Sequence, residues 1–450
     1  MSMKTVLGSV VSFAVLFGAN GADTVGPVFT GSAAFAQEEA KPKKPKTIRV
    51  QSMKKPTYET LTLAQEAIEL KDYATADIQL REGLANKKTN EYEKASIWMT
   101  FAYLYAEQEN YNGAIESFQN AINLSNPLEG IGLPPGQVIS TKYNLGQLYM
   151  VVERYQDAIR ILEEWRREVE TVNPGALVLL SNAYYQVEQY IVAIPLIIEA
   201  IDIHAQPRED EFGELVQAEP REQWYQLLLA AYFELEDYPA GADLLEIMVD
   251  LFPTKKTYFL QLAALYGELG KDKQSFQVLV MADKQGFLDK DSELVRLARM
   301  YMYHETPIKA AEVMERGFKA KLIKRTPENL EILANSYFNS REFNKAIPPL
   351  RDAANGSEKG KLSYRLGQAF LQNEQWADAE AALKKSLEKK GLRKNEEGMV
   401  WMLIGITQLE RERFTAAKRS MARSARFKNT KSDAGKWIRF LDQKIATAGS

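Results

Sequence analysis

The sequence contains few residues of the kinds that carry out catalysis or bind metals. Its 450 residues include two histidines, His204 and His304, and no cysteine. Disulfides, thiol catalysis and zinc sites built on thiolates are therefore excluded. No Gly-rich phosphate loop, HExxH or GxSxG pattern occurs, so we predict no cofactor, no metal site and no enzyme activity. Acidic residues are plentiful, which keeps a glycan-acting enzyme with two carboxylates as a less favoured alternative.

Basic side chains form two clusters that could bind an acidic partner. Between Lys41 and Lys55 there are seven basic residues and no acidic one. From Lys384 to Ser450 there are 17 Lys/Arg and 7 Asp/Glu, a net charge of +10. The net charge of the whole chain is −3, which argues against a general nucleic-acid binder. A solvated linker and a solvated helical surface are the simpler interpretations of the two clusters.

The candidate contact residues in these clusters are Lys41, Lys43, Lys44, Lys46 and Arg49 in the first, and Arg419, Arg423 and Arg426 in the second. The three arginines are spaced by four and three residues and share one face of a helix. Such a face could contact an acidic protein, anionic lipid at a membrane surface, or a cell-wall polymer.

The first 36 residues have the pattern of an export signal. Lys4 precedes an apolar run from Val6 to Phe17, and Ala34-Phe35-Ala36 has the small-x-small form of a cleavage site. The run is short for a membrane span, although an uncleaved anchor is the alternative. We predict a signal peptide over 1–36, cleavage near Ala36, a soluble mature protein in the periplasm, and a basic Pro/Lys-rich linker over 37–56.

The rest of the chain predicts pairs of helices, most clearly from Trp98 to Ala121. Trp98, Phe101, Ala102 and Tyr105 lie on one helical face, and a second face carries alanine, phenylalanine and alanine at 114, 118 and 121. This pattern of large and small residues resembles the tetratricopeptide repeat (TPR) motif.

About ten such units follow one another over 57–430. The resemblance implies an all-α TPR α-solenoid, a right-handed superhelix of helix-turn-helix repeats. Two spacings exceed the repeat period, and we expect a loop at 126–136 and an acidic insertion at 204–220. The apolar face of the last residues predicts a capping helix and tail over 431–450, and His304 is expected at a helix joint.

In TPR proteins the first helix of each unit lines a concave groove that holds a peptide or protein partner. Aligning the motif with this chain places ten aromatic and amide side chains on that wall: Tyr103, Tyr143, Gln147, Asn182, Tyr185, Phe233, Asn335, Phe338, Tyr364 and Gln368. Amides can bond both the N–H and the C=O of a bound backbone, and aromatic rings supply contact area. The alternative for each residue is packing against the next helix.

The start of the mature chain suggests a more specific relationship. Lys46-Thr-Ile-Arg-Val-Gln-Ser-Met53, followed by Tyr58-Glu-Thr-Leu-Thr-Leu-Ala-Gln65, resembles exported bacterial TPR proteins described as components of the TonB system. The resemblance implies a non-catalytic periplasmic scaffold that binds TonB, ExbB or ExbD and supports TonB-dependent outer-membrane uptake. A periplasmic TPR scaffold for envelope polysaccharide or cell-wall assembly and export is the alternative.

Overall fold

The computed structural model describes residues 52–448, and these residues fold almost entirely into helices. The helices are α1 (Lys55–Glu69), α2 (Tyr73–Ala85), α3 (Glu91–Glu107), α4 (Tyr111–Asn123), α5 (Pro135–Val151), α6 (Tyr155–Glu168), α7 (Pro174–Gln186), α8 (Tyr190–Ala205), α9 (Glu222–Glu234), α10 (Tyr238–Leu251), α11 (Lys256–Glu268), α12 (Asp272–Lys284), α13 (Asp291–Tyr303), α14 (Pro307–Lys319), α15 (Pro327–Asn339), α16 (Phe343–Asn355), α17 (Gly360–Gln372), α18 (Trp376–Glu388), α19 (Lys394–Glu410), α20 (Phe414–Ser424) and α21 (Lys431–Ala448). Two short strands, β1 (Arg208–Glu209) and β2 (Leu215–Val216), lie between α8 and α9.

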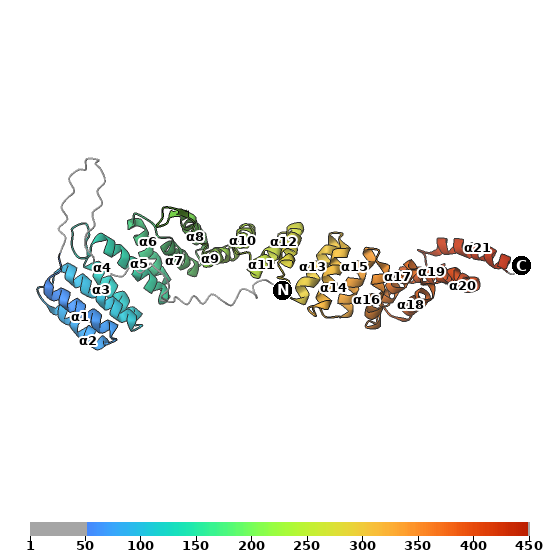
Figure 1. The fold of residues 1–450 in the computed structure, drawn as a ribbon, viewed down its shortest axis with the longest axis horizontal. Coiled ribbons are helices and arrows are strands. Elements are labelled where there is room, and N and C mark those ends of the chain that lie inside the picture. The colour runs from blue at the N-terminus through green and yellow to red at the C-terminus, as the bar shows by residue number, and fades with distance from the viewer. Residues whose placement is uncertain (1–51, 449–450) are drawn as a thin grey trace, which may run out of the picture. The chain divides into compact units, whose positions relative to one another are not determined.

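The described helices form ten consecutive pairs, α1–α2 to α19–α20, followed by α21 (Figure 1). This confirms the all-α repeat architecture expected from the sequence. The chain divides into two compact units, one up to Gly241 and one from Ala242 onward. Helix α1 begins at Lys55, so the folded region already includes the last residues of the stretch 37–56 that we assigned to the linker.

In most of the pairs, a small residue on the first helix lies where that helix approaches the second; the α9–α10 pair differs, with Leu229 at the equivalent position. Ala102, Ala298 and Ala334 are fully buried at this position. At Gly146 and Gly367, an added Cβ would lie 2.6 Å from Leu162 and from Leu383 respectively. The small residues therefore allow the two helices to approach closely, as the sequence pattern predicted.

This close approach predicts opposite effects for two glycine substitutions in the second unit. Gly367→Ala should destabilise the protein by about 1–2 kcal/mol, because overpacking against Leu383 outweighs the better helix propensity of alanine. Gly435→Ala in α21 should stabilise by up to about 1 kcal/mol, because nothing lies within 4 Å of its added Cβ. Urea unfolding of both variants followed by circular dichroism tests this, and equal effects would contradict the packing argument.

The two helices of every pair are joined by the same short turn. At all ten joints within residues 52–448, the residue two positions before the second helix has a positive φ. At the α3–α4 joint this residue is Glu109, with φ 56°. Its N–H donates to the Ala106 carbonyl at 2.9 Å, and the Asn110 N–H donates to the Tyr105 carbonyl at 2.8 Å. This is a Schellman ending of the first helix, and the Asn110 side chain then caps α4 by accepting from Gly113 N–H.

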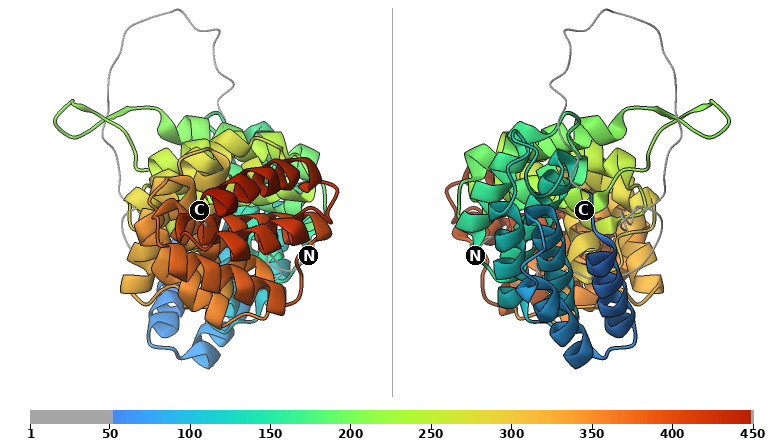
Figure 2. Two further views of the ribbon diagram at one scale, coloured as in Figure 1. Left: turned by 90° about the vertical axis from the view of Figure 1, so that its right-hand side faces the viewer. Right: turned by 90° about the vertical axis from the view of Figure 1, so that its left-hand side faces the viewer.

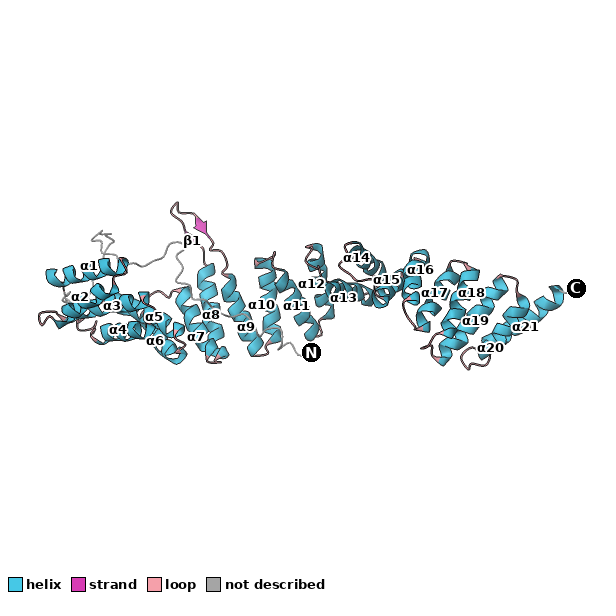
Figure 3. Ribbon diagram, turned by 90° about the horizontal axis from the view of Figure 1, so that it is seen from below, coloured by secondary structure: helices cyan, strands magenta, loops and turns pink. Residues whose placement is uncertain are grey.

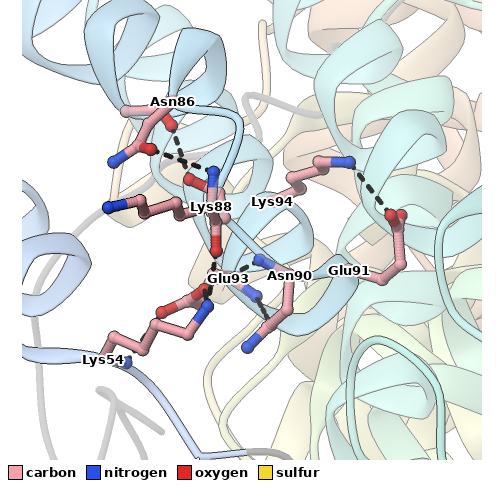
Figure 4. Close-up of polar contacts among 9 residues, drawn as sticks. Lys54, Asn86, Lys88, Asn90, Glu91, Glu93 and Lys94 are labelled. Carbon is pink, nitrogen blue, oxygen red and sulfur yellow. Dashed lines mark hydrogen bonds and ion pairs between the residues drawn. The ribbon is translucent and has the colours of Figure 1, made fainter.

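A buried carboxylate fixes the start of the folded region to the second repeat (Figure 4). The side chain of Glu93, at the beginning of α3, is fully buried. It accepts the backbone N–H of Lys54 at 2.7 Å and that of Asn90 at 2.8 Å, and the Lys54 ammonium lies 3.7 Å away. Burial alone would raise the pKa of Glu93, but these hydrogen bonds and a further one with Thr57 hold that pKa below its ordinary value.

Helix α21 covers the C-terminal end of the second unit. It packs on α20, beside which it lies in Figures 1 and 2. Leu441 is fully buried against Ala417 and Met421, and Trp437 and Ile438 pack on the same cluster. The helix thus covers the apolar surface that a further repeat would otherwise cover, as expected for a cap.

The two long connections in the first unit differ in structure. Residues 124–134 form the expected loop, which Leu133 anchors in the core beside Ala121 and Val138. The acidic insertion begins later than expected, because α8 continues through Ala205 and includes His204. His204 Nε2 lies 2.9 Å from the Glu219 carbonyl, and its ring packs edge-on against Trp224. The helix continues because residues 196–203 are mostly apolar and keep the helical pattern, with Leu196, Ile197 and Ala200 buried.

The insertion itself forms a β-hairpin that the sequence did not predict. Strands β1 and β2 pair antiparallel, and the hairpin projects from the helices beside α8 and α9 (Figures 2 and 3). The Asp210 carboxylate accepts the N–H groups of Phe212 and Glu214 at 2.8 and 2.9 Å, and Gly213 has a φ of 76°. These contacts define a tight turn with Phe212 at its tip.

Candidate binding groove

In the first unit, the predicted groove residues lie on the first helices of successive pairs. Tyr103, Gln147 and Asn182 each follow the small residue of α3, α5 and α7. Because α5 contacts α7 and α7 contacts α9, equivalent residues on these helices lie in one row. Tyr103 is 48% exposed and its ring meets Phe118 edge-on, with ring centres 6.0 Å apart. It therefore offers an accessible aromatic surface.

The other groove residues of this unit are half-buried. Tyr143 packs against Trp165, with ring centres 5.9 Å apart, and hydrogen-bonds with Gln147. The side-chain oxygen Oδ1 of Asn182 accepts a hydrogen bond from Gln186 Nε2 at 3.3 Å. Tyr143 therefore belongs partly to the core, whereas Asn182 keeps its own amide N–H groups for another partner.

Two aromatic pairs extend the row toward the end of the unit. Tyr185 packs edge-on against Tyr190, and Phe233 packs against Tyr238. Burial, together with the negative charge of Glu234, raises the pKa of Tyr185, and burial raises the pKa of Tyr103 and Tyr143. All three phenols therefore stay protonated near neutral pH and can donate hydrogen bonds to a carbonyl.

In the second unit, two predicted groove residues are engaged by one arginine. Arg365 Nη1 donates to Asn335 Oδ1 at 2.6 Å, and its guanidinium lies 5.5 Å from the centre of the Phe338 ring. Tyr364 packs partly into the cluster of Leu383, Val400 and Ile404, and Gln368 is half-buried. Asn335 and Phe338 thus bridge adjacent repeats as well as facing outward.

Sequence reasoning missed a pocket of about 560 Å³ along α13 in the second unit. It is lined by Asp272, Ser292, Val295, Arg296, Arg299, Met300 and Tyr303. Arg299 follows the buried Ala298 as Tyr103 follows Ala102, so extending the same alignment to α13 would have selected it. Two guanidiniums beside apolar side chains make this a candidate site for an acidic and partly apolar ligand.

Looser helix packing opens this pocket. Helix α13 packs less closely on α12 than α15 packs on α14 or α17 on α16. Arg296 extends across the gap, and its Nη2 lies 3.3 Å from the Ala263 carbonyl and 3.3 Å from Ser275 Oγ. Arg299 forms no hydrogen bond or ion pair with any residue the structure describes, and it is exposed. Its guanidinium is therefore available to an anionic group of a ligand.

The predicted basic face near the C-terminus is exposed. Arg419, Arg423 and Arg426 are all exposed, and none of them forms an ion pair within the described part of the chain. The prediction of one shared helical face is wrong for Arg426, because α20 ends at Ser424 and Arg426 lies in the turn that follows. The guanidinium of Arg423 lies over the Trp401 ring, 4.4 Å from its centre. The predicted basic arm (Lys41, Lys43, Lys44, Lys46 and Arg49) and the signal peptide over 1–36 lie outside the described residues.

Within residues 52–448, each histidine packs against an aromatic side chain. His304 lies at the α13–α14 joint, as expected, stacked on Phe276 with ring centres 4.4 Å apart. Over the same range, no three His, Cys, Asp or Glu side chains converge in a way that could hold a metal ion. Among the described helices, none combines the length and apolar character needed to cross a bilayer.

Comparison with known proteins supports the repeat architecture. Residues 333–392 and 364–426 match the tetratricopeptide repeat family model. None of the curated proteins matches the chain in sequence. The chain also resembles many solved structures, among them the following three.

A TPR protein from Parabacteroides merdae is 12% identical, with 63% of this chain and 99% of that one covered and a TM-score of 0.35. The protein MamA is 16% identical, with 43% and 92% covered and a TM-score of 0.34. YrrB, described as a TPR protein with an unusual peptide-binding site, is 14% identical, with 46% and 91% covered and a TM-score of 0.33.

The family match and the ten helix pairs together define the class of fold, an all-α TPR solenoid. Proteins of this class generally act as scaffolds that bind other proteins or peptides on an extended surface.

Proposed function

We propose that this protein is an exported, non-catalytic TPR scaffold that binds a component of the TonB–ExbB–ExbD complex in the periplasm and supports TonB-dependent uptake. The row of Tyr103, Gln147 and Asn182 carries the binding part of this proposal. These uncharged side chains offer an exposed ring and amide groups to an extended peptide, and they repeat at the spacing of the helix pairs.

The choice of partner rests on the opening segment from Lys46 to Met53, through its resemblance to TPR proteins of the TonB system. Export rests on the signal-like sequence of residues 1–36. The basic arm that follows would assist docking on an acidic partner surface, because its charge is of one sign.

A crosslinking pull-down from intact cells tests the proposal. Tagged protein should recover TonB, ExbB or ExbD, and Tyr103→Ala with Asn182→Ala should reduce recovery at least about tenfold if these residues form the centre of the contact. This pair is preferable to Tyr143, whose truncation would also remove packing against Trp165. Leu128→Ala, at a fully solvent-facing loop position, is the matched control and should leave recovery unchanged.

The pull-down also separates the alternative, a scaffold for envelope polysaccharide or cell-wall assembly. The unpaired Arg419, Arg423 and Arg426 favour that alternative, because anionic polymers bind exposed basic faces. Recovery of polymer-export proteins without TonB components would replace the TonB assignment. Turnover of a glycan or of peptidoglycan by the purified protein would contradict a non-catalytic role.

A further inference from the structure

The β-hairpin between α8 and α9 carries a charge and an apolar tip that nothing else in the described structure covers. Residues 208–219 include five acidic residues and one basic residue, and no ion pair neutralises the acidic ones within the described chain. Phe212 is 81% exposed, Leu215 72% and Val216 50%. A two-stranded hairpin is only marginally stable alone, and a projecting phenylalanine is typical of an interface anchor.

The pocket along α13 has the complementary chemistry. Val295, Met300 and Tyr303 provide apolar surface, and Arg296 and Arg299 provide positive charge beside it. Its volume of about 560 Å³ lies within the range of pockets that bind small ligands, which leaves room for a phenylalanine side chain. Asp272 also lines the pocket, but it pairs with neither arginine.

We propose that the hairpin of one copy of this chain docks into the α13 pocket of a second copy, with Phe212 among the apolar side chains and the acidic residues beside it facing Arg299. Charge complementarity supports this choice of occupant. An aromatic residue flanked by carboxylates meets an apolar pocket flanked by guanidiniums, and charge-assisted contacts of this kind are strong when they are shielded from water.

The contact joins two different surfaces, so it is heterologous. After two copies pair, one still has a free pocket and the other a free hairpin, so assembly continues into a ring or an open chain. This self-association goes beyond the proposed function and is independent of the TonB assignment.

Sedimentation velocity of the purified protein over a range of concentrations tests the proposal. The average mass should rise with concentration and fall at high salt, because screening weakens the charged contact. The pocket variant Arg299→Glu and the hairpin variant Phe212→Ser with Glu211→Lys should each weaken association about tenfold or more. Circular dichroism should show unchanged helix content, since all three residues are exposed.

Mixing the two variants gives the decisive result. The pocket variant keeps an intact hairpin and the hairpin variant an intact pocket, so an equimolar mixture should form complexes of two chains and none larger. Lys284→Glu and Glu116→Lys, exposed charge reversals elsewhere in each unit, should associate as the unmodified protein does. The proposal would be overturned by a protein that stays monomeric at all concentrations. It would also be overturned if both variants still assembled.

Discussion

Glu380→Gln is expected to destabilise the last two repeats by about 2–3 kcal/mol, because it removes the charge from a buried carboxylate that several donors share. Glu380 on α18 is 3% exposed. It accepts from Gln408 at 2.8 Å and from Arg411 at 2.7 Å, and Arg413 and Lys384 lie 3.1 and 2.8 Å from its oxygens. The substitution leaves these cations around a neutral amide.

Hydrogen exchange of α18–α20 measures this effect locally, which suits a repeat protein whose parts need not unfold together. Glu388→Gln, at an exposed position on the same helix, is the control and should change stability by less than about 0.5 kcal/mol. Equal protection in the two variants would show that the cluster contributes nothing.

The same cluster should make these repeats sensitive to acid. Burial alone would raise the pKa of Glu380, but hydrogen bonds from Lys384 and Gln408 and the charges of Lys384 and Arg413 lower that pKa overall. A lowered pKa in the folded state gives stability that is present above the unfolded value of about 4.3 and is lost as the pH falls through the folded pKa. Acid unfolding monitored by α18–α20 exchange should lose this sensitivity in Glu380→Gln.

Replacing three of the left-handed glutamates at the joints by glycine should stabilise the first unit by about 0.5–1 kcal/mol per site. Glu109, Glu153 and Glu188 have φ values of 56°, 59° and 62°, a region that costs a residue with a Cβ about 1–2 kcal/mol. Part of this gain is offset by the greater freedom of glycine in the unfolded chain. The triple glycine variant should therefore gain about 1.5–3 kcal/mol in thermal or urea unfolding.

Two variants control for the loss of charge. The corresponding triple alanine variant removes the same three carboxylates but keeps a Cβ, so it should not be stabilised. Gly270 lies at the equivalent position of the α11–α12 joint, with a φ of 68°. Gly270→Ala should therefore lower the free energy of unfolding by about 1 kcal/mol. Equal stabilisation by glycine and alanine would assign the effect to charge instead of backbone conformation.

The sequence predicted the repeats because each pair depends on local residues. The small residue, the joint aromatic residue and the following alanine lie within one helix pair, and their spacing determines which faces of the two helices meet. The predicted groove residues were chosen from the same spacing, and their role in binding stays a prediction. Contacts between successive helix pairs were less predictable, as the hydrogen bond from Arg365 on α17 to Asn335 on α15 illustrates.

The pocket and the hairpin escaped prediction for different reasons. The pocket depends on how loosely α13 packs on α12, which no local pattern encodes, although the position of Arg299 in the motif was available. The hairpin has strands of two residues each, too short for an alternating pattern, in a segment dominated by acidic residues. The Glu380 cluster joins residues 28–33 positions apart, so only the folded chain brings them together.

The contacts at the two ends of the folded region also affect where the array opens first. In a linear stack of repeats, each terminal repeat has only one neighbour and normally unfolds locally before the interior repeats do. Here Glu93 ties the first helix to the second repeat, and α21 covers the last one. Fraying at both ends is therefore suppressed, and within the second unit the loose α12–α13 junction becomes a preferred place for local opening. Any molecule seated along α13 would close that weak point and lengthen the lifetime of the folded unit as a whole.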